Sequence, residues 1–84
     1  HVAVALEFDL EEMTAPLVVA KGQDEVARRI KKVAREHDIE IVEEKELART
    51  LHQTVEIGEE IPAELYQAVA EILAYVYELE ERRL

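Results

Sequence analysis

The stretch LVVAKGQDEVARRIKKVAREH, residues 17–37, decides the fold of this 84-residue chain. The continuous apolar run Leu17 to Ala20 is typical of a short buried strand, which the pair Lys21-Gly22 ends. From about Asp24 to His37 the apolar residues recur at helical spacing, so the sequence predicts a helix directly after this strand. A strand that leads into a helix indicates an α/β domain.

Toward the C-terminus, Ile39-Glu40-Ile41-Val42 predicts a third strand. A strand, a helix and a strand in this order form a right-handed crossover, so we expect strands two and three to be parallel. A short helix is expected around Leu47, Ala48 and Leu51, and Gly58 should break the chain after it. Pro62 suits the first position of a last helix. One buried face of that helix is predicted to comprise Leu65, Ala68, Val69, Ile72, Leu73 and Val76.

Toward the N-terminus, large apolar residues from Val2 to Phe8 alternate with Ala3, Ala5 and Glu7, which is the period of a strand. The opposite face is mostly alanine, so a helix can pack close to it, and we expect cover on both sides. The acidic stretch Asp9–Thr14 is interpreted as a connection, and Pro16 is expected to start or edge a strand. The prediction is one α/β domain over residues 1–84, with a small mixed sheet of three strands and three helices.

The formal net charge of −10 argues against nucleic acid as a partner and against direct contact with an anionic membrane surface. Hydrophobic residues make up 49% of the chain, which is enough for a folded core. Six of the ten basic residues are concentrated between positions 21 and 35: Lys21, Arg28, Arg29, Lys31, Lys32 and Arg35. This cluster is either a solvated helix face or a positive strip for an acidic partner, with Arg28, Arg29, Lys32 and Arg35 as its candidate residues.

The residues give little support for catalysis or for a cofactor. The chain has no serine and no cysteine, which excludes serine and thiolate nucleophiles. His1, His37 and His52 do not repeat a metal-ligand spacing, so no metal site and no cofactor is expected. An anion at the helix start after Gly22 is a weak alternative. The more ordinary interpretation is that Gly22 supplies a permissive backbone angle and Lys21 lies on the surface. On this basis alone, the chain is a small acidic interaction domain.

Three stretches in order resemble one family over nearly the whole chain: HVAVAL at 1–6, APLVVAKG at 15–22 and IGEEIPAELY at 57–66. They are similar to the cytoplasmic domain of the FlhB/YscU/SpaS export-switch family, and more to its flagellar branch. Members of this family cleave themselves once at an Asn-Pro-Thr-His motif. The resemblance implies that His1 is the last residue of this motif, where it assists the asparagine. The asparagine itself is not in this chain, so the chain is not expected to act as an enzyme.

The resemblance further implies a domain at the cytoplasmic face of the bacterial inner membrane, tethered through an upstream transmembrane domain. Expected partners are rod- and hook-type export substrates, other export-gate proteins and the upstream half of the cleaved chain, which contributes a fourth strand. The domain would help to switch export to filament-type substrates. Substrates are expected to bind at Ala15, Pro16, Ala70 and Leu73.

Two points stay open at this stage. Leu73 can equally be a core residue. Ala15 and Pro16 are better candidates for the surface, because a proline before a strand is seldom buried. The alternative function is a standalone protein-interaction domain that shares the fold and not the switching role.

Overall fold

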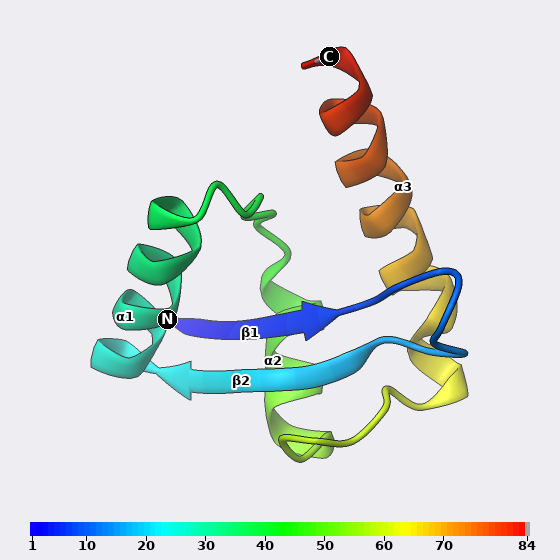
Figure 1. The fold of residues 1–84 in the computed structure, drawn as a ribbon. Coiled ribbons are helices and arrows are strands. Elements are labelled where there is room, and N and C mark those ends of the chain that lie inside the picture. Colours follow the sequence, from blue (N-terminus) through cyan, green and yellow to red (C-terminus); the bar gives the residue numbers. More distant parts are fainter. Residues whose placement is uncertain (84) are drawn as a thin grey trace.

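The computed structural model describes residues 1–83 and contains two strands and three α-helices (Figure 1). The strands are β1 (Val2–Glu7) and β2 (Leu17–Gln23). The helices are α1 (Asp24–Glu36), α2 (Lys45–Thr54) and α3 (Tyr66–Arg82), and the short 3₁₀ turn η1 (Ala63–Leu65) precedes α3. The three predicted helices are therefore confirmed, as is the α/β class.

β1 and β2 form an antiparallel ribbon whose two faces differ in side-chain size. Opposite residues in such a pair point to the same face. Leu6 lies opposite Val18 and Val4 lies opposite Lys21, and these four form the aliphatic face. The opposite, small-residue face consists of the pairs Ala3 with Gly22 and Ala5 with Ala20. The register shifts between Ala5 and Leu6, where Val19 is an extra residue on β2. Because of this bulge, the aliphatic pairs and the small-residue pairs each stay on one face of the ribbon on both sides of the shift.

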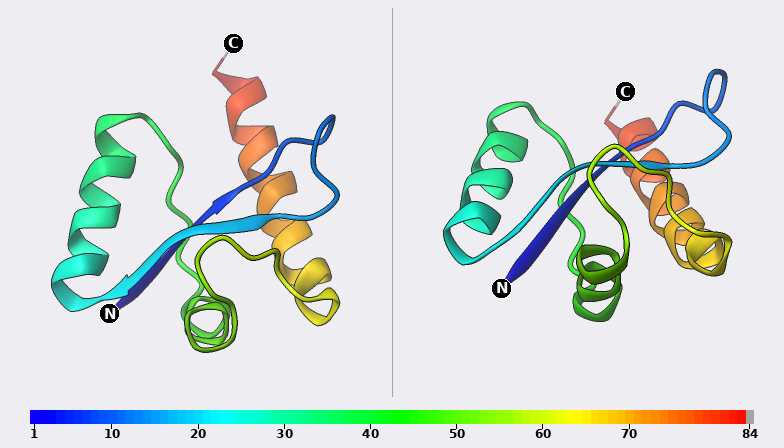
Figure 2. Two further views of the ribbon diagram at one scale, coloured as in Figure 1. Left: turned by 60° about the horizontal axis from the view of Figure 1, so that its bottom comes forward. Right: turned by 90° about the horizontal axis from the view of Figure 1, so that it is seen from below.

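Helices cover both faces of the ribbon, as the sequence predicted. Figure 2 shows α1 on one side, and α2 with α3 on the other. The main core lies on the aliphatic face and is formed by Val18, Leu51, Val55, Ile61 and Val69. On the small-residue face, α1 buries Ala27 completely and leaves Val26 and Val33 almost half exposed. The helix thus turns its alanine side to the ribbon and leaves Val26 and Val33 on its outer flank.

The predicted third strand at residues 39–42 is absent, and so is the parallel crossover: the described sheet has two antiparallel strands. The segment alternates correctly, but a strand also needs a partner about 4.8 Å away. The backbone hydrogen bond that the segment does make, from Ile39 N–H to the Ala34 carbonyl at 2.8 Å, extends the last turn of α1. Ile39 and Ile41 remain 59% and 41% exposed.

Gly22 is required for close packing and not for a special backbone angle. Among the described residues, Gly58 is the glycine with a positive φ, at 92°. A Cβ atom on Gly22 would instead collide with the side chain of Val26 in α1. Because the Cβ of Val26 is among the atoms met, a change of rotamer cannot relieve the collision. The small-residue face therefore fixes how closely α1 approaches.

Candidate functional site

The loop before β2 is joined to the segment that leads into α3. Ile61 N–H donates to the Pro16 carbonyl at 3.0 Å, and Leu17 pairs with Glu60 in an isolated bridge. Two further backbone bonds follow along the same edge of β2, between Val18 and the 58–59 turn. These bonds hold Ala15 and Pro16 at the end of the ribbon where η1 and α3 begin.

The four residues expected to bind substrates have different exposures. Ala15 is 1% exposed and Pro16 is also buried, so the expectation that these two residues lie on the surface is wrong. Burial costs little here, because proline has no N–H to satisfy and its carbonyl is paired. Leu73 is half-buried and packs against the main core, whereas Ala70 is exposed. Leu73 therefore serves the core and still keeps part of its surface open.

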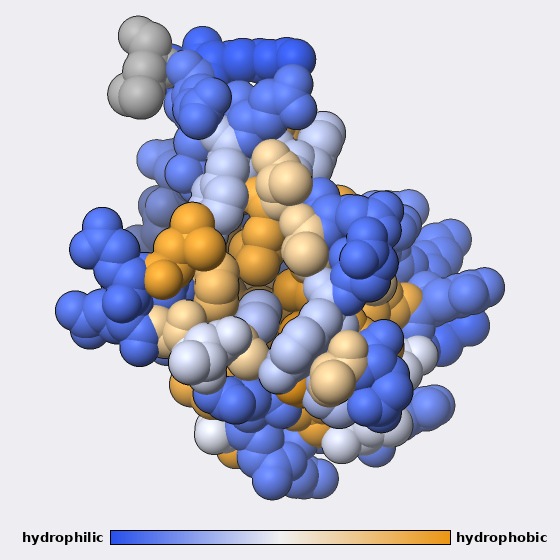
Figure 3. Space-filling model, turned by 90° about the vertical axis from the view of Figure 1, so that its right-hand side faces the viewer, coloured by the Kyte–Doolittle hydropathy of each residue, from blue (hydrophilic) through white to orange (hydrophobic). Residues whose placement is uncertain are grey.

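Apolar side chains gather on this side of the molecule. Figure 3 views the molecule from the side of the β1–β2 loop and α3, with hydrophobic atoms at the centre and a hydrophilic rim around them. We call the region of Ala15, Pro16, Ala70 and Leu73 the apolar end. Only Ala70 and Leu73 of this set offer side-chain surface to a ligand, because Ala15 and Pro16 are buried.

His1 lies at the opposite end of β1. Its side chain is exposed, and its carbonyl accepts a hydrogen bond of 2.9 Å from the N–H of Asp24, the first residue of α1. A strand rises about 3.4 Å per residue, so β1 places His1 roughly 20 Å from the apolar end. The two expected sites are therefore separate, and the structure does not bring them together.

The four candidate partner-binding cations, Arg28, Arg29, Lys32 and Arg35, are all exposed on α1. Arg28 forms an ion pair with Glu25 one turn earlier, and both side chains are about three-quarters exposed. Pairs of this kind contribute little to stability. The helix face is thus available to solvent along its length.

Lys21 is the polar residue that the sequence analysis placed wrongly. Its ammonium group donates to the carbonyls of His52 and Val55, each at 2.9 Å, and the residue is half-buried. It therefore binds the C-terminal end of α2, where a cation is favoured, rather than an anion at the start of α1. The pairing of Lys21 with Val4 on the aliphatic face could have indicated this from the register.

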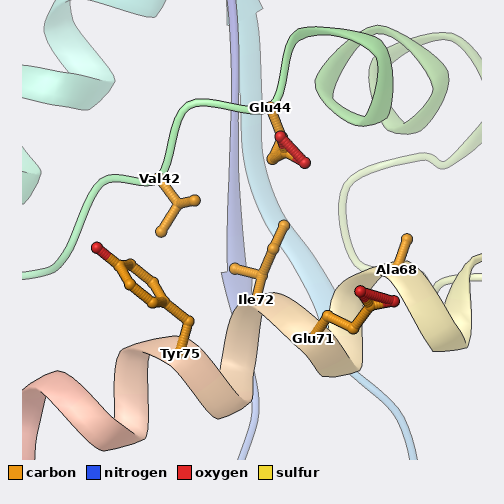
Figure 4. Close-up of a pocket in the computed structure, with 6 residues that line it drawn as sticks. All are labelled: Val42, Glu44, Ala68, Glu71, Ile72 and Tyr75. Carbon is orange, nitrogen blue, oxygen red and sulfur yellow. The ribbon is translucent and has the colours of Figure 1, made fainter.

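A hollow of about 270 Å³ lies between α3 and the 39–44 linker, and the sequence analysis did not predict it (Figure 4). Val42, Ile72 and Tyr75 supply its apolar walls, and Glu44 and Glu71 stand at its edge. The spacing of Ala68, Ile72 and Tyr75 on one side of α3 is the signal that could have found it.

Across residues 1–83, no cluster of three His, Cys, Asp or Glu side chains has the arrangement of a metal site. Within the same residues, no helix is long and apolar enough to cross a membrane.

The architecture defines a small α/β domain in which helices cover both faces of an antiparallel ribbon. The model of the FlhB HrpN YscU SpaS family matches residues 1–76. The chain therefore belongs to this family, which confirms the resemblance seen in the sequence.

Known relatives agree in sequence and in fold. The chain is 57% identical to the flagellar biosynthetic protein FlhB of Helicobacter pylori over 83 residues, which are 99% of this chain. It superposes on the cytoplasmic domain of FlhB from Shewanella putrefaciens with a TM-score of 0.93 at 44% identity, covering 99% of this chain and 68% of that one. The PscU C-terminal domain gives a TM-score of 0.86 at 36% identity, with 89% and 95% covered. The chain spans 23% of the length of the Helicobacter relative and of the FlhB protein of Bacillus subtilis.

Proposed function

We propose that this chain is a substrate-docking domain of a flagellar protein-export apparatus, and that it takes part in the switch from rod- and hook-type to filament-type substrates. Membership of the family supports the general role, because its relatives are named as flagellar biosynthetic proteins. The observation that carries the docking role is the apolar end, where Leu73 keeps open surface beside the exposed Ala70.

The chemistry of the apolar end suits a short apolar segment. Ala70 is small, so a ligand side chain can approach α3 and cover Leu73. Burial of roughly 80 Å² of apolar surface at about 25 cal/mol per Å² would contribute about 2 kcal/mol. Such a modest gain fits substrates that must bind and then be released.

The docking proposal is tested by titrating the domain with the export segment of a rod- or hook-type substrate in a calorimeter. Ala70→Glu places a charge on the apolar end without disturbing the core, because Ala70 is exposed. We expect it to weaken binding at least tenfold. The control is Ala68→Glu, on the side of α3 that faces the 39–44 linker (Figure 4). Equal losses in the two variants, or no binding by the unchanged domain, would contradict the proposal.

We also infer that a segment upstream of His1 adds a strand to the free edge of β1. β1 pairs with β2 along one edge, and Figure 1 shows the 38–44 linker passing on its other side. Unpaired strand edges favour the addition of another strand. An added strand would offer a ladder partner to residues 39–42 and would cover Ile39 and Ile41, which are exposed.

Within this proposal, His1 is the last residue of an upstream self-cleavage motif and assists the asparagine of that motif. Support comes from its place directly before β1, where the bond to Asp24 holds its backbone. The test is an intact-mass spectrum of the protein expressed with its native upstream segment. We expect a C-terminal fragment that begins Pro-Thr-His and disappears when the asparagine is changed. An uncut chain would refute self-cleavage and leave the docking test unaffected.

The proposed location is the cytoplasmic face of the bacterial inner membrane, with an upstream transmembrane domain as the tether and other export-gate proteins as neighbours. Two findings support this location: the chain superposes on the cytoplasmic domain of FlhB from Shewanella putrefaciens, and it matches only about a quarter of the length of its relatives. A reading frame without membrane spans upstream would favour the standalone interaction domain instead.

A further inference from the structure

The exposed face of α1 concentrates positive charge in a chain whose net charge is −10. Residues 26–35 include five Arg or Lys residues and no Asp or Glu, so the rest of the chain holds five cations against twenty acidic residues. Lys31 is half-buried, and the other four cations are exposed. We call these four, Arg28, Arg29, Lys32 and Arg35, the basic strip.

The internal ion pairs do not account for this concentration of charge. Arg28 pairs with Glu25, and both side chains are so exposed that the pair adds little stability. Within residues 1–83, Arg29, Lys32 and Arg35 form no ion pair. Their charges repel one another along the helix, and like charges at this spacing are mildly destabilising. The strip therefore contributes little to the fold and is available to a ligand.

The dimensions of the strip restrict the shape of that ligand. From Arg28 to Arg35 the helix rises roughly 10 Å, at about 1.5 Å per residue. Asp24 and Glu25 precede the strip, and Glu36 and Asp38 follow it. A flat membrane surface or a nucleic acid backbone would extend past both ends and meet these carboxylates. A narrow ligand with two or three negative charges would meet the cations alone.

An apolar surface runs beside the charges. Val33 is 46% exposed and lies one turn after Arg29, so the two side chains are neighbours on the helix. Val26 is 47% exposed on the same flank. We propose that the basic strip binds a short acidic segment of another polypeptide. Two or three Asp or Glu side chains of this segment would pair with the cations, and an apolar residue would pack on Val33. This surface is independent of the docking proposed at the apolar end.

The probe is a capped twelve-residue peptide with glutamates one helical turn apart and leucines between them, titrated into the labelled domain by NMR. We expect saturable shifts of the Arg29 and Val33 amides. The Kd should rise at least fivefold between 50 and 300 mM salt, because salt screens exposed charges. The double variant R29E/K32E should lose at least tenfold in affinity. The control K45E/R49E makes the same charge change at exposed residues of α2 and should stay within twofold.

Three results would overturn the proposal. The first is the absence of saturable shifts on α1, and the second is an equal loss of affinity in both double variants with unchanged melting temperatures. The third is tighter binding to phosphatidylserine vesicles, to a single-stranded DNA 12-mer or to a second copy of the domain, the last detected by sedimentation. Each of these would assign the strip to a different ligand or to solvent.

Discussion

The two faces of the β1–β2 ribbon pack against their helices in different ways. On the aliphatic face, Leu6 and Val18 contribute large side chains to a core shared with α2 and α3. On the small-residue face, Ala3 and Gly22 contribute almost no side-chain volume, and α1 approaches closely instead. The ribbon therefore holds α2 and α3 through buried apolar area, and it holds α1 through close packing against small residues.

This difference in packing corresponds to the two proposed binding surfaces, the apolar end and the basic strip. The large core continues into Leu73, so the apolar end is a partly open edge of the main core. α1 needs few of its own side chains for packing, so most of its surface is free to carry charge. Substitutions that remove buried area from the aliphatic face and substitutions that disturb close packing on the small-residue face should therefore lower the free energy of unfolding by different amounts.

The largest expected effect is on the aliphatic face. Leu51→Ala removes a side chain that is 3% exposed, and we expect it to lower the free energy of unfolding by about 3 kcal/mol. Ile30→Ala, at a half-buried position on α1, is the counterpart and should cost about 1 kcal/mol. Urea unfolding followed by circular dichroism measures both. Equal costs would show that the two faces depend on buried area to the same extent.

The next effect tests fit on the small-residue face. Gly22→Ala adds one methyl group that collides with Val26, and overpacking of this kind should cost about 2 kcal/mol. Gly58→Ala is the control, because its surroundings are open and only its φ of 92° is strained. That control should cost about 1 kcal/mol. If Gly22→Ala leaves unfolding unchanged, α1 is not held by close approach.

Lys21 tests the polar contact on the aliphatic face. Lys21→Met keeps most of the stem and removes the two bonds to the His52 and Val55 carbonyls. We expect a loss of about 1.5 kcal/mol, because two carbonyls lose their charged donor. Lys45→Met, at an exposed position, should change stability by less than about 0.5 kcal/mol. Equal stabilities of Lys21→Met and Lys45→Met would mean that water replaces the Lys21 ammonium group without a cost in free energy.

The smallest effect is at the C-terminus of α1, where Asp38 has a φ of 56°. Asp38→Gly relieves this left-handed conformation and removes a negative charge near the negative end of the helix, so it should stabilise the domain by about 0.5–1 kcal/mol. Asp38→Asn removes the charge alone and should give a smaller gain. Thermal unfolding compares the two, and a destabilised glycine variant would contradict the assignment.

The helices and both paired strands were predictable because their patterns are local. The alternation from Val2 and the spacing around Val69 each report a face that is buried in the structure. The failures were at features that depend on distant chain segments. Residues 39–42 have the alternation of a strand and no neighbouring edge. Lys21 is half-buried because the carbonyls at the end of α2 lie nearby.

The predictions for the candidate site were also wrong where they depended on distant chain segments. The resemblance indicated Pro16 and Leu73, but their burial depends on the bond to Ile61 and on the core beneath α3. The hollow beside Tyr75 was not predicted, because the spacing on α3 indicates only one of its walls and the 39–44 linker supplies the other.

The most direct test of the account is an NMR map of the domain during titration with the export segment of a rod- or hook-type substrate. We expect saturable shifts centred on Ala70 and Leu73, with smaller ones at Ala15 and none on α1. Shifts centred on α1, or no shifts at all, would contradict the assignment of the apolar end as the substrate-docking surface.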